Sequence, residues 1–293
     1  MPVPPRTDPL PLHHAYLRVE YDGTPFHGWT RQPDGLATIE GELLDAFAKV
    51  HCHDVELCCA GRTDAGVHAS AQFVGARYRG TITPERLARA LSGNMRHELA
   101  IVAAAPAPEG FDARRDATSR AYEYRLLPRR EPSPLRHRHV LHHPRPLDRE
   151  ALERVAATIE GQHRFTAFTP SRTSHVYFDR TIVTSRWIER GDELVYEVRA
   201  NAFLRHMVRV LVGTMLAVGR GDCGIDEFEA MLAGAPRSEA FQTAPPHGLC
   251  LVDVTWEPVP GLPIPPGWSG ERAAALRELA SRPTVAVPFS TPG

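Results

Sequence analysis

The segment best suited to chemistry is residues 60–69, which read AGRTDAGVHA. It brings an arginine, an aspartate and a histidine together between two stretches that read as strands. Gly61 and Gly66 allow a ligand to approach the backbone beside Asp64, and catalytic groups often lie on loops held by a rigid scaffold. A carboxylate there can act as a nucleophile. Taken alone, an aspartate in such a loop is more commonly the cap of a turn, bonded to nearby backbone N–H groups.

The wider context favours the catalytic interpretation, because five segments resemble the tRNA pseudouridine synthase A family in the order typical of that family. The segments are 21–32 (YDGTPFHGWTRQ), 61–68 (GRTDAGVH), 120–124 (RAYEY), 201–209 (NAFLRHMVR) and 244–251 (APPHGLCL). One departure is Phe26, which stands where the family commonly has tyrosine. The resemblance covers roughly residues 15–256 and leaves both ends of the chain outside it.

This resemblance implies a fold, an activity and partners. The expected fold is α+β, the pseudouridine-synthase fold. It has a curved, mainly antiparallel sheet of two pseudo-symmetric halves, flanked by helices, with the active-site cleft between the halves. The expected activity is isomerisation of uridine to pseudouridine at positions 38, 39 and 40 of the tRNA anticodon arm. The family works without a cofactor or metal, and its members are homodimers.

The resemblance also implies roles for individual residues. By motif position, Asp64 is the nucleophile and Arg209 is the cation that pairs with it. A buried carboxylate needs such a partner, because desolvation disfavours its charged form. Tyr122 matches the tyrosine that stacks on the uracil, and whether it also takes part in proton transfer at C5 is open. Leu249 matches the residue that packs on the other side of the base. Whether the carboxylate attacks C1′, attacks C6 or assists a glycal route is open.

Other residues are candidates for holding RNA. The target base must leave its stack, which costs a few kcal/mol. Arg62 is placed to fill the vacated space or to hold a phosphate, and Arg205 is a candidate for a backbone contact. Arg114, Arg115 and Arg220 are further candidates of the same kind. His68 is expected to orient the loop.

Two other functions compete with the synthase. A metal-dependent hydrolase would use Asp64 and His68 as ligands, and it would need a third ligand that the flanking sequence does not supply. A non-catalytic RNA-binding module would keep the cleft but usually lose the nucleophile or its basic partner. Asp64, Tyr122 and Arg209 are all present.

The elements that must position these residues alternate between strand and helix signals. Strands are expected at about 17–21, 55–60, 72–78, 99–105, 122–126, 180–190, 193–200 and 249–256. Helices are expected to begin after Thr38, Thr83 and Asp148, and to cover 203–218 and 226–233. Adjacent strands with intervening helices predict an α+β fold with a largely antiparallel sheet.

Proline and charge are unevenly distributed. The chain has 27 prolines in 293 residues, and the terminal segments 1–14 and 257–293 are proline-rich. The sequence therefore predicts two tails, an N-terminal half at 15–110 with the catalytic loop, and a C-terminal half at 111–256. A short helix is expected at 271–280. The net charge of −1 combines acidic segments at 20–60 and 222–239 with basic segments at 114–145 and 199–220, which permits RNA binding on one face.

The expected location is the cytoplasm. No apolar run approaches the ~20 residues that span a bilayer, and the polar N-terminus lacks the apolar core of a signal peptide. Five cysteines, an odd number without a CxxC pair, fit a reducing compartment better than a disulfide framework or a zinc site.

Overall fold

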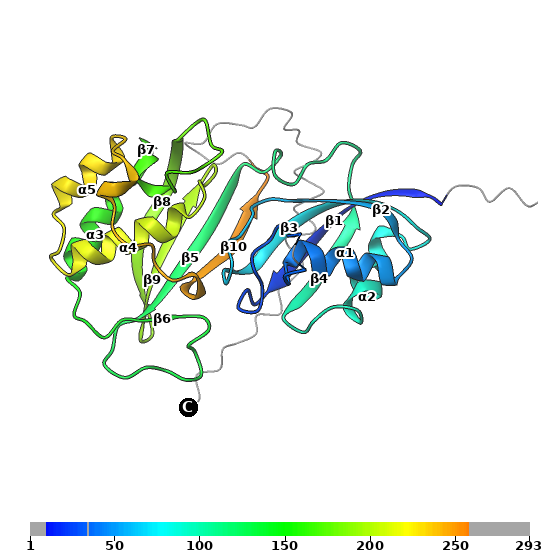
Figure 1. The fold of residues 1–293 in the computed structure, drawn as a ribbon, viewed down its shortest axis with the longest axis horizontal. Coiled ribbons are helices and arrows are strands. Elements are labelled where there is room, and N and C mark those ends of the chain that lie inside the picture. Colours follow the sequence, from blue (N-terminus) through cyan, green and yellow to red (C-terminus); the bar gives the residue numbers. More distant parts are fainter. Residues whose placement is uncertain (1–9, 34, 258–293) are drawn as a thin grey trace, which may run out of the picture.

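A ten-stranded mixed sheet runs through the molecule (Figure 1). The structure is a computed structural model that describes residues 10–33 and 35–257. The principal strands lie in the order β4-β1-β3-β10-β5-β9-β8-β7, while β2 pairs with β3 and β6 with β5. The strands are β1 (Leu12–Tyr21), β2 (His53–Cys59), β3 (His68–Arg79), β4 (Leu99–Pro106), β5 (Ser119–Leu127), β6 (Leu141–His142), β7 (Gly161–Arg164), β8 (Asp179–Arg190), β9 (Glu193–Ala200) and β10 (Leu249–Thr255).

Two groups of strands meet at the pair formed by β3 and β10. This pair is parallel and short, with Cys250 opposite His68 and Leu251 opposite Ala69. Strands β1, β2 and β4 lie on the β3 side of the junction, and β5, β9, β8 and β7 lie on the β10 side. The pairs within each group are antiparallel apart from β5 with β6. The predicted α+β fold with a mainly antiparallel sheet is confirmed.

In the part of the chain that the structure describes, five α-helices accompany the two groups of strands. Helices α1 (Ile39–Lys49) and α2 (Leu87–Ser92) lie beside the first group, and α3 (Arg149–Ala157), α4 (Met207–Gly219) and α5 (Ile225–Leu232) lie beside the second (Figure 1). Thr38 and Asp148 cap α1 and α3 by accepting hydrogen bonds from backbone N–H groups in the first turn, as the sequence predicts. No helix in residues 10–33 and 35–257 has the length and apolar character needed to cross a membrane.

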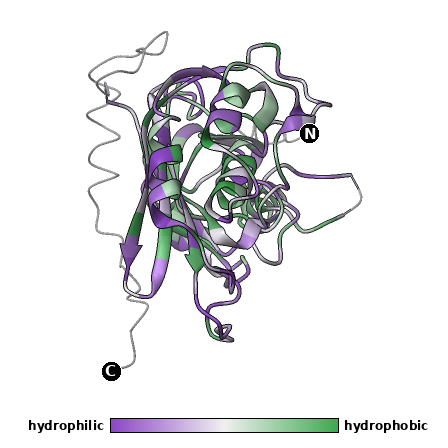
Figure 2. Ribbon diagram, turned by 90° about the vertical axis from the view of Figure 1, so that its left-hand side faces the viewer, coloured by the Kyte–Doolittle hydropathy of each residue, from purple (hydrophilic) through white to green (hydrophobic). Residues whose placement is uncertain are grey.

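The core lies where the helices meet the sheet, and hydrophobic ribbon segments gather there (Figure 2). Helix α4 is the most enclosed helix. All its residues are buried except Arg209 and Gly213, and Arg209 is its one charged residue. A helix that is apolar around most of its circumference belongs in a protein interior. Because α4 is held in the interior, the backbone of Arg209 is fixed in position.

The prediction of a helix over 203–218 is wrong at its start. Helix α4 begins at Met207, because His206 has a φ angle of 60° and a left-handed residue cannot continue a right-handed helix. The short strands β6 and β7 also escape prediction. Their sequences, LH and GQHR, carry no alternation of apolar and polar residues. The helix expected at 271–280 lies outside the described residues.

Candidate active site

The loop between β2 and β3, residues 60–67, presents Asp64 at a turn. The N–H of Val67 donates to the carbonyl of Asp64 at 3.1 Å. Gly66 has a φ angle of 77°, and a β-carbon added there would come within 2.9 Å of the Pro246 ring. Glycine therefore suits this position twice, because the left-handed backbone and the close approach both disfavour a side chain. The contact with Pro246 also brings the segment before β10 against the loop.

Asp64 forms an ion pair with Arg209, as the resemblance implies. Nη1 of Arg209 donates to Oδ2 of Asp64 at 3.0 Å, although the two residues are 145 positions apart. The side chains are 14% and 24% exposed, so the pair is largely shielded from water. Nε of Arg209 donates to the carbonyl of Ala244 at 2.8 Å, which holds the guanidinium in place. The carboxylate is thus held on one oxygen by a fixed cation.

A histidine that the sequence analysis did not single out lies at the other carboxylate oxygen. Nε2 of His206 is 3.6 Å from Oδ1 of Asp64, and its side chain is 27% exposed. Burial lowers the pKa of His206, and the charges of Arg209 and Arg205 lower it further, against the opposite effect of Asp64. We therefore expect a neutral imidazole at neutral pH. The sequence analysis did not identify His206 as a site residue because the apolar pattern placed it inside the helix expected at 203–218.

Tyr122 lies on β5 beside the 60–67 loop. Its side chain is buried, and the ring meets Phe203 edge-on with centroids 5.1 Å apart. The hydroxyl reaches Gly61, where an added β-carbon would lie 3.4 Å from the phenol oxygen. Burial, and next the charge of Asp64, raise the pKa of Tyr122 well above its usual range. The phenol is therefore protonated at any physiological pH.

Leu249 begins β10 and is buried, 5% exposed. It lies opposite Tyr124, while Leu251 lies opposite Tyr122. Leu249 is therefore a diagonal neighbour of Tyr122 on the same face of the sheet. Tyr124 is fully buried and donates its hydroxyl hydrogen to the carbonyl of Pro245, consistent with the core role expected for it.

The arginines predicted to hold RNA are not all equally available. Arg62 and Arg205 are exposed, and their guanidinium groups make no hydrogen bond or ion pair to residues that the structure describes. Much of the predicted basic segment 114–145 is neutralised. Arg136 forms ion pairs with Asp192 and Glu193, and Arg125 pairs with Glu193 as well. The free positive charge is thus smaller than the sequence count indicates.

Arg120 is a second residue near the site that the sequence analysis did not single out, although it lies in the RAYEY segment. It is buried, and its guanidinium donates to carbonyl oxygens of Ala60, Ala117, Asn201 and Arg114. Burial lowers the pKa of Arg120 to about 10, so it remains charged at neutral pH. The side chain joins the start of the catalytic loop to the segment preceding α4. We regard it as a positioning residue.

His68 is held on both ring nitrogens, as expected for a residue that orients the loop. The N–H of Gly23 lies 3.0 Å from Nδ1, and Nε2 lies 3.2 Å from the carbonyl of His247. Within the described residues, His68 lies in a cluster of possible metal ligands with Asp22 and His139. Asp64 is not part of this cluster. This arrangement does not favour the metal-dependent hydrolase.

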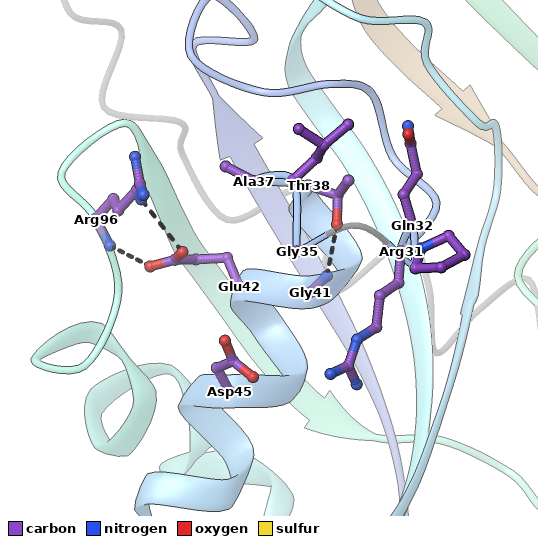
Figure 3. A pocket seen from close by; sticks show the side chains of 11 residues that line it. Arg31, Gln32, Gly35, Ala37, Thr38, Gly41, Glu42, Asp45 and Arg96 are labelled. Carbon is purple, nitrogen blue, oxygen red and sulfur yellow. Dashed lines mark hydrogen bonds and ion pairs between the residues drawn. The ribbon is translucent and has the colours of Figure 1, made fainter.

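A polar cavity of about 580 Å³ opens away from these residues, between the 31–38 loop and the first turns of α1 (Figure 3). Arg31, Glu42, Asp45 and Arg96 line it, and Glu42 pairs with Arg96. None of Asp64, Arg209 and Tyr122 is among its lining residues. The loop is nevertheless linked to the catalytic loop, because the N–H of Trp29 donates to the carbonyl of Thr63 at 3.0 Å.

Comparison with known proteins agrees with this arrangement. Residues 18–115 and 155–257 match the family described as tRNA pseudouridine synthase. The tRNA pseudouridine synthase A of Frankia casuarinae is 41% identical over 271 residues, covering 92% of this chain and 96% of the relative. A relative of that name from Solibacter usitatus is 39% identical, with 84% of this chain and 100% of the relative covered. Another, from Roseiflexus castenholzii, is 41% identical, with 84% and 91% covered. The chain belongs to the tRNA pseudouridine synthase family.

Proposed function

We propose that this protein isomerises uridine to pseudouridine at positions 38, 39 and 40 in the anticodon stem-loop of tRNAs. Asp64 acts as the nucleophile, and the target base is flipped out of its stack. The observation that carries the proposal is the shielded ion pair between Asp64 and Arg209, formed across 145 residues beside a buried tyrosine. Family membership and the relatives' name, tRNA pseudouridine synthase A, support it.

The reaction balances without a redox partner. The N1–C1′ bond of uridine breaks, the uracil turns, and a C5–C1′ bond forms. The C5 proton leaves and N1 gains a proton, so the product is an isomer of the substrate. A carboxylate that attacks carbon and is later expelled is sufficient for such a sequence, provided that it is held in position.

The two oxygens of Asp64 differ in their surroundings. Oδ2 accepts the hydrogen bond from Arg209, whereas Oδ1 faces His206 at 3.6 Å, beyond hydrogen-bond distance. We infer that Oδ1 is the attacking oxygen. Arg209 keeps the carboxylate charged and oriented in a site from which a bound nucleotide excludes water. Attack at C1′, attack at C6 and the glycal route all begin from this geometry.

Tyr122 is proposed to contact the uracil with its ring rather than to act as a base. The phenol stays protonated, because burial and the charge of Asp64 raise its pKa. A phenolate oxygen could accept the C5 proton as a base, but the protonated phenol of Tyr122 cannot. Leu249, on the same face of the sheet, is proposed to bound the other side of the base.

The RNA backbone is proposed to follow the arginines around the loop. Arg205 and Arg237 lie close enough to His206 to lower its pKa, so positive charge gathers on the side of the site where His206 lies. Arg62 and Arg205 are exposed and unengaged within the described part of the chain. Guanidinium groups in this state bind phosphate with little desolvation.

A direct test uses an unmodified tRNA transcript incubated with the protein in EDTA, followed by chemical mapping of pseudouridine. We expect modification at positions 38–40 that persists in EDTA and disappears in Asp64→Ala. Cleavage of the transcript that EDTA blocks, without pseudouridine, would favour the hydrolase. Tight binding of tRNA without any modification by the unaltered protein would favour the RNA-binding module.

The setting of the protein is part of the proposal. We propose a homodimer in the cytoplasm that recognises the anticodon arm, with support from the sequence resemblance. We also propose two halves, 15–110 and 111–256, between tails at 1–14 and 257–293. The parallel β3–β10 pair, which joins two antiparallel groups of strands, supports this division. Size-exclusion chromatography with light scattering tests the oligomeric state.

A further inference from the structure

A cluster of three side chains that can bind metal lies at the C-terminal end of the 60–67 loop. Asp22 follows β1, His68 opens β3, and His139 lies in the segment between β5 and β6. Nδ1 of His68 is 3.1 Å from Oδ1 of Asp22, and Nε2 of His139 is 3.8 Å from Oδ2 of Asp22. The two imidazole rings are 4.7 Å apart. All three potential ligand atoms lie within 4.8 Å of one another.

The hydrogen bonds of His68 indicate which of its nitrogens carries a lone pair. The N–H of Gly23 points at Nδ1 at 3.0 Å, so Nδ1 is an acceptor there. Nε2 then carries the hydrogen and donates it to the carbonyl of His247 at 3.2 Å. The one lone pair of Nδ1 is the ligand that His68 can offer, and Oδ1 of Asp22 lies 3.1 Å from it. Either a proton on Nδ1 or a metal ion can bridge these two atoms.

We propose that Asp22, His68 and His139 form a binding site for a divalent transition-metal ion, with Zn²⁺ as the best match. Two imidazole nitrogens and a carboxylate oxygen are ligands that zinc accepts, and water supplies the fourth position. Ligands of a tetrahedral zinc ion with bonds of ~2.0–2.1 Å lie about 3.4 Å apart, close to the shorter spacings here. Ligation through Nδ1 replaces one hydrogen bond from Gly23 by a metal bond.

The groups around the cluster fit this assignment. A metal-bound histidine commonly donates its other N–H to a backbone carbonyl, and Nε2 of His68 does so to His247. Asp22 accepts hydrogen bonds from the N–H and hydroxyl of Thr24. These two hydrogen bonds orient the carboxylate.

The site serves structure rather than catalysis. Asp64 is not a member of the cluster, and the proposed reaction needs no metal. Asp22 and His68 belong to the N-terminal group of strands, whereas His139 belongs to the segment that follows β5. A bound ion would clamp that segment to the end of the catalytic loop, because His68 follows Asp64 by four residues. The side chains of Asp22 and His139 are 21% and 29% exposed, so an ion can enter.

The test measures metal binding by the full chain, independently of any RNA. The metal-free protein is titrated with Zn²⁺ against a chromophoric chelator and, separately, with Co²⁺, whose visible absorption reports coordination geometry. We expect one tight site per chain with a four-coordinate Co²⁺ spectrum, and a higher Tm with Zn²⁺. His139→Ala should weaken binding at least tenfold, and it is the variant least prone to misfold because His139 is the most exposed of the three ligands.

His142→Ala is the matched control. His142 lies three residues along, on β6, and its Nε2 contacts the carbonyl of Arg129 rather than the cluster. We expect this variant to bind Zn²⁺ as the parent does. Equal weakening in both variants, unchanged binding in His139→Ala, or no tight site in the parent would each overturn the proposal. Pseudouridine formation does not enter this test, so its failure leaves the proposed function untouched.

Discussion

Replacing Arg209 by alanine should slow the chemical step far more than it weakens tRNA binding. The guanidinium makes a charge-assisted hydrogen bond of 3.0 Å to Asp64 and a hydrogen bond of 2.8 Å to the carbonyl of Ala244. Only the first bears on the nucleophile. A hydrogen bond to a charged group contributes about 1.5–3 kcal/mol. Both side chains are less than a third exposed, so solvent screening reduces this little. The expected loss in rate is roughly 10- to 150-fold.

Single-turnover kinetics separate the two effects, because the maximal rate at saturating enzyme reports chemistry and the half-saturation concentration reports affinity. Arg209→Lys should recover part of the rate, since it retains charge but not the two-armed contact. Arg154→Ala is the matched control. Its ion pair with Glu150 has the same 3.0 Å separation but is exposed on α3, and such a pair contributes little. Equal losses of rate and affinity in Arg209→Ala would refute the role of Arg209.

Three further predictions follow from the surroundings of the site. Tyr122→Phe should keep most of the rate while Tyr122→Ala loses it, because the ring makes the contact; abolition by Tyr122→Phe in the same kinetic assay would instead assign proton transfer to the hydroxyl. Arg62→Ala should weaken tRNA binding and make the slope of log K against log salt shallower by about 0.9, with an unchanged maximal rate. A lost rate at unchanged affinity would place Arg62 in the vacated base stack. In metal-free buffer, the free energy of unfolding should fall as pH decreases through about 6.5. Burial lowers the pKa of His143, His175 and His206, so the unfolded chain binds protons that the folded chain does not. Constant stability from pH 7.5 to 5.5 in urea unfolding would contradict this.

Features set by local chemistry were predictable from the sequence. Thr38 and Asp148 cap helices where their side chains were expected to do so. The predicted helix after Thr83 exists, although its first turn is a 3₁₀ turn, Pro84–Arg86, that leads into α2. The Asp64–Arg209 contact was expected through the family resemblance alone, because nothing in either local segment indicates a partner 145 residues away.

Features set by distant contacts were not predictable. The apolar pattern predicts a helix from residue 203, but the left-handed backbone of His206 delays its start to Met207. Only the folded chain shows that the His206 ring lies beside Asp64. Arg120 reads as an ordinary charge on a strand until its four carbonyl acceptors are seen. Charge counts along the sequence likewise overstate the basic surface, because Arg136 is neutralised by Asp192, in the turn before β9, and by Glu193, the first residue of β9.

The most direct test of the account is pseudouridine formation by Asp64→Asn at saturating enzyme. Asparagine keeps the shape of the side chain and its place near Arg209 but removes the nucleophilic charge. The account predicts that tRNA affinity stays within about threefold of the parent, since RNA binding rests on the arginines. It also predicts that no pseudouridine forms on the bound transcript. Pseudouridine formed by the variant at a rate within tenfold of the parent would contradict the central claim that Asp64 is the nucleophile.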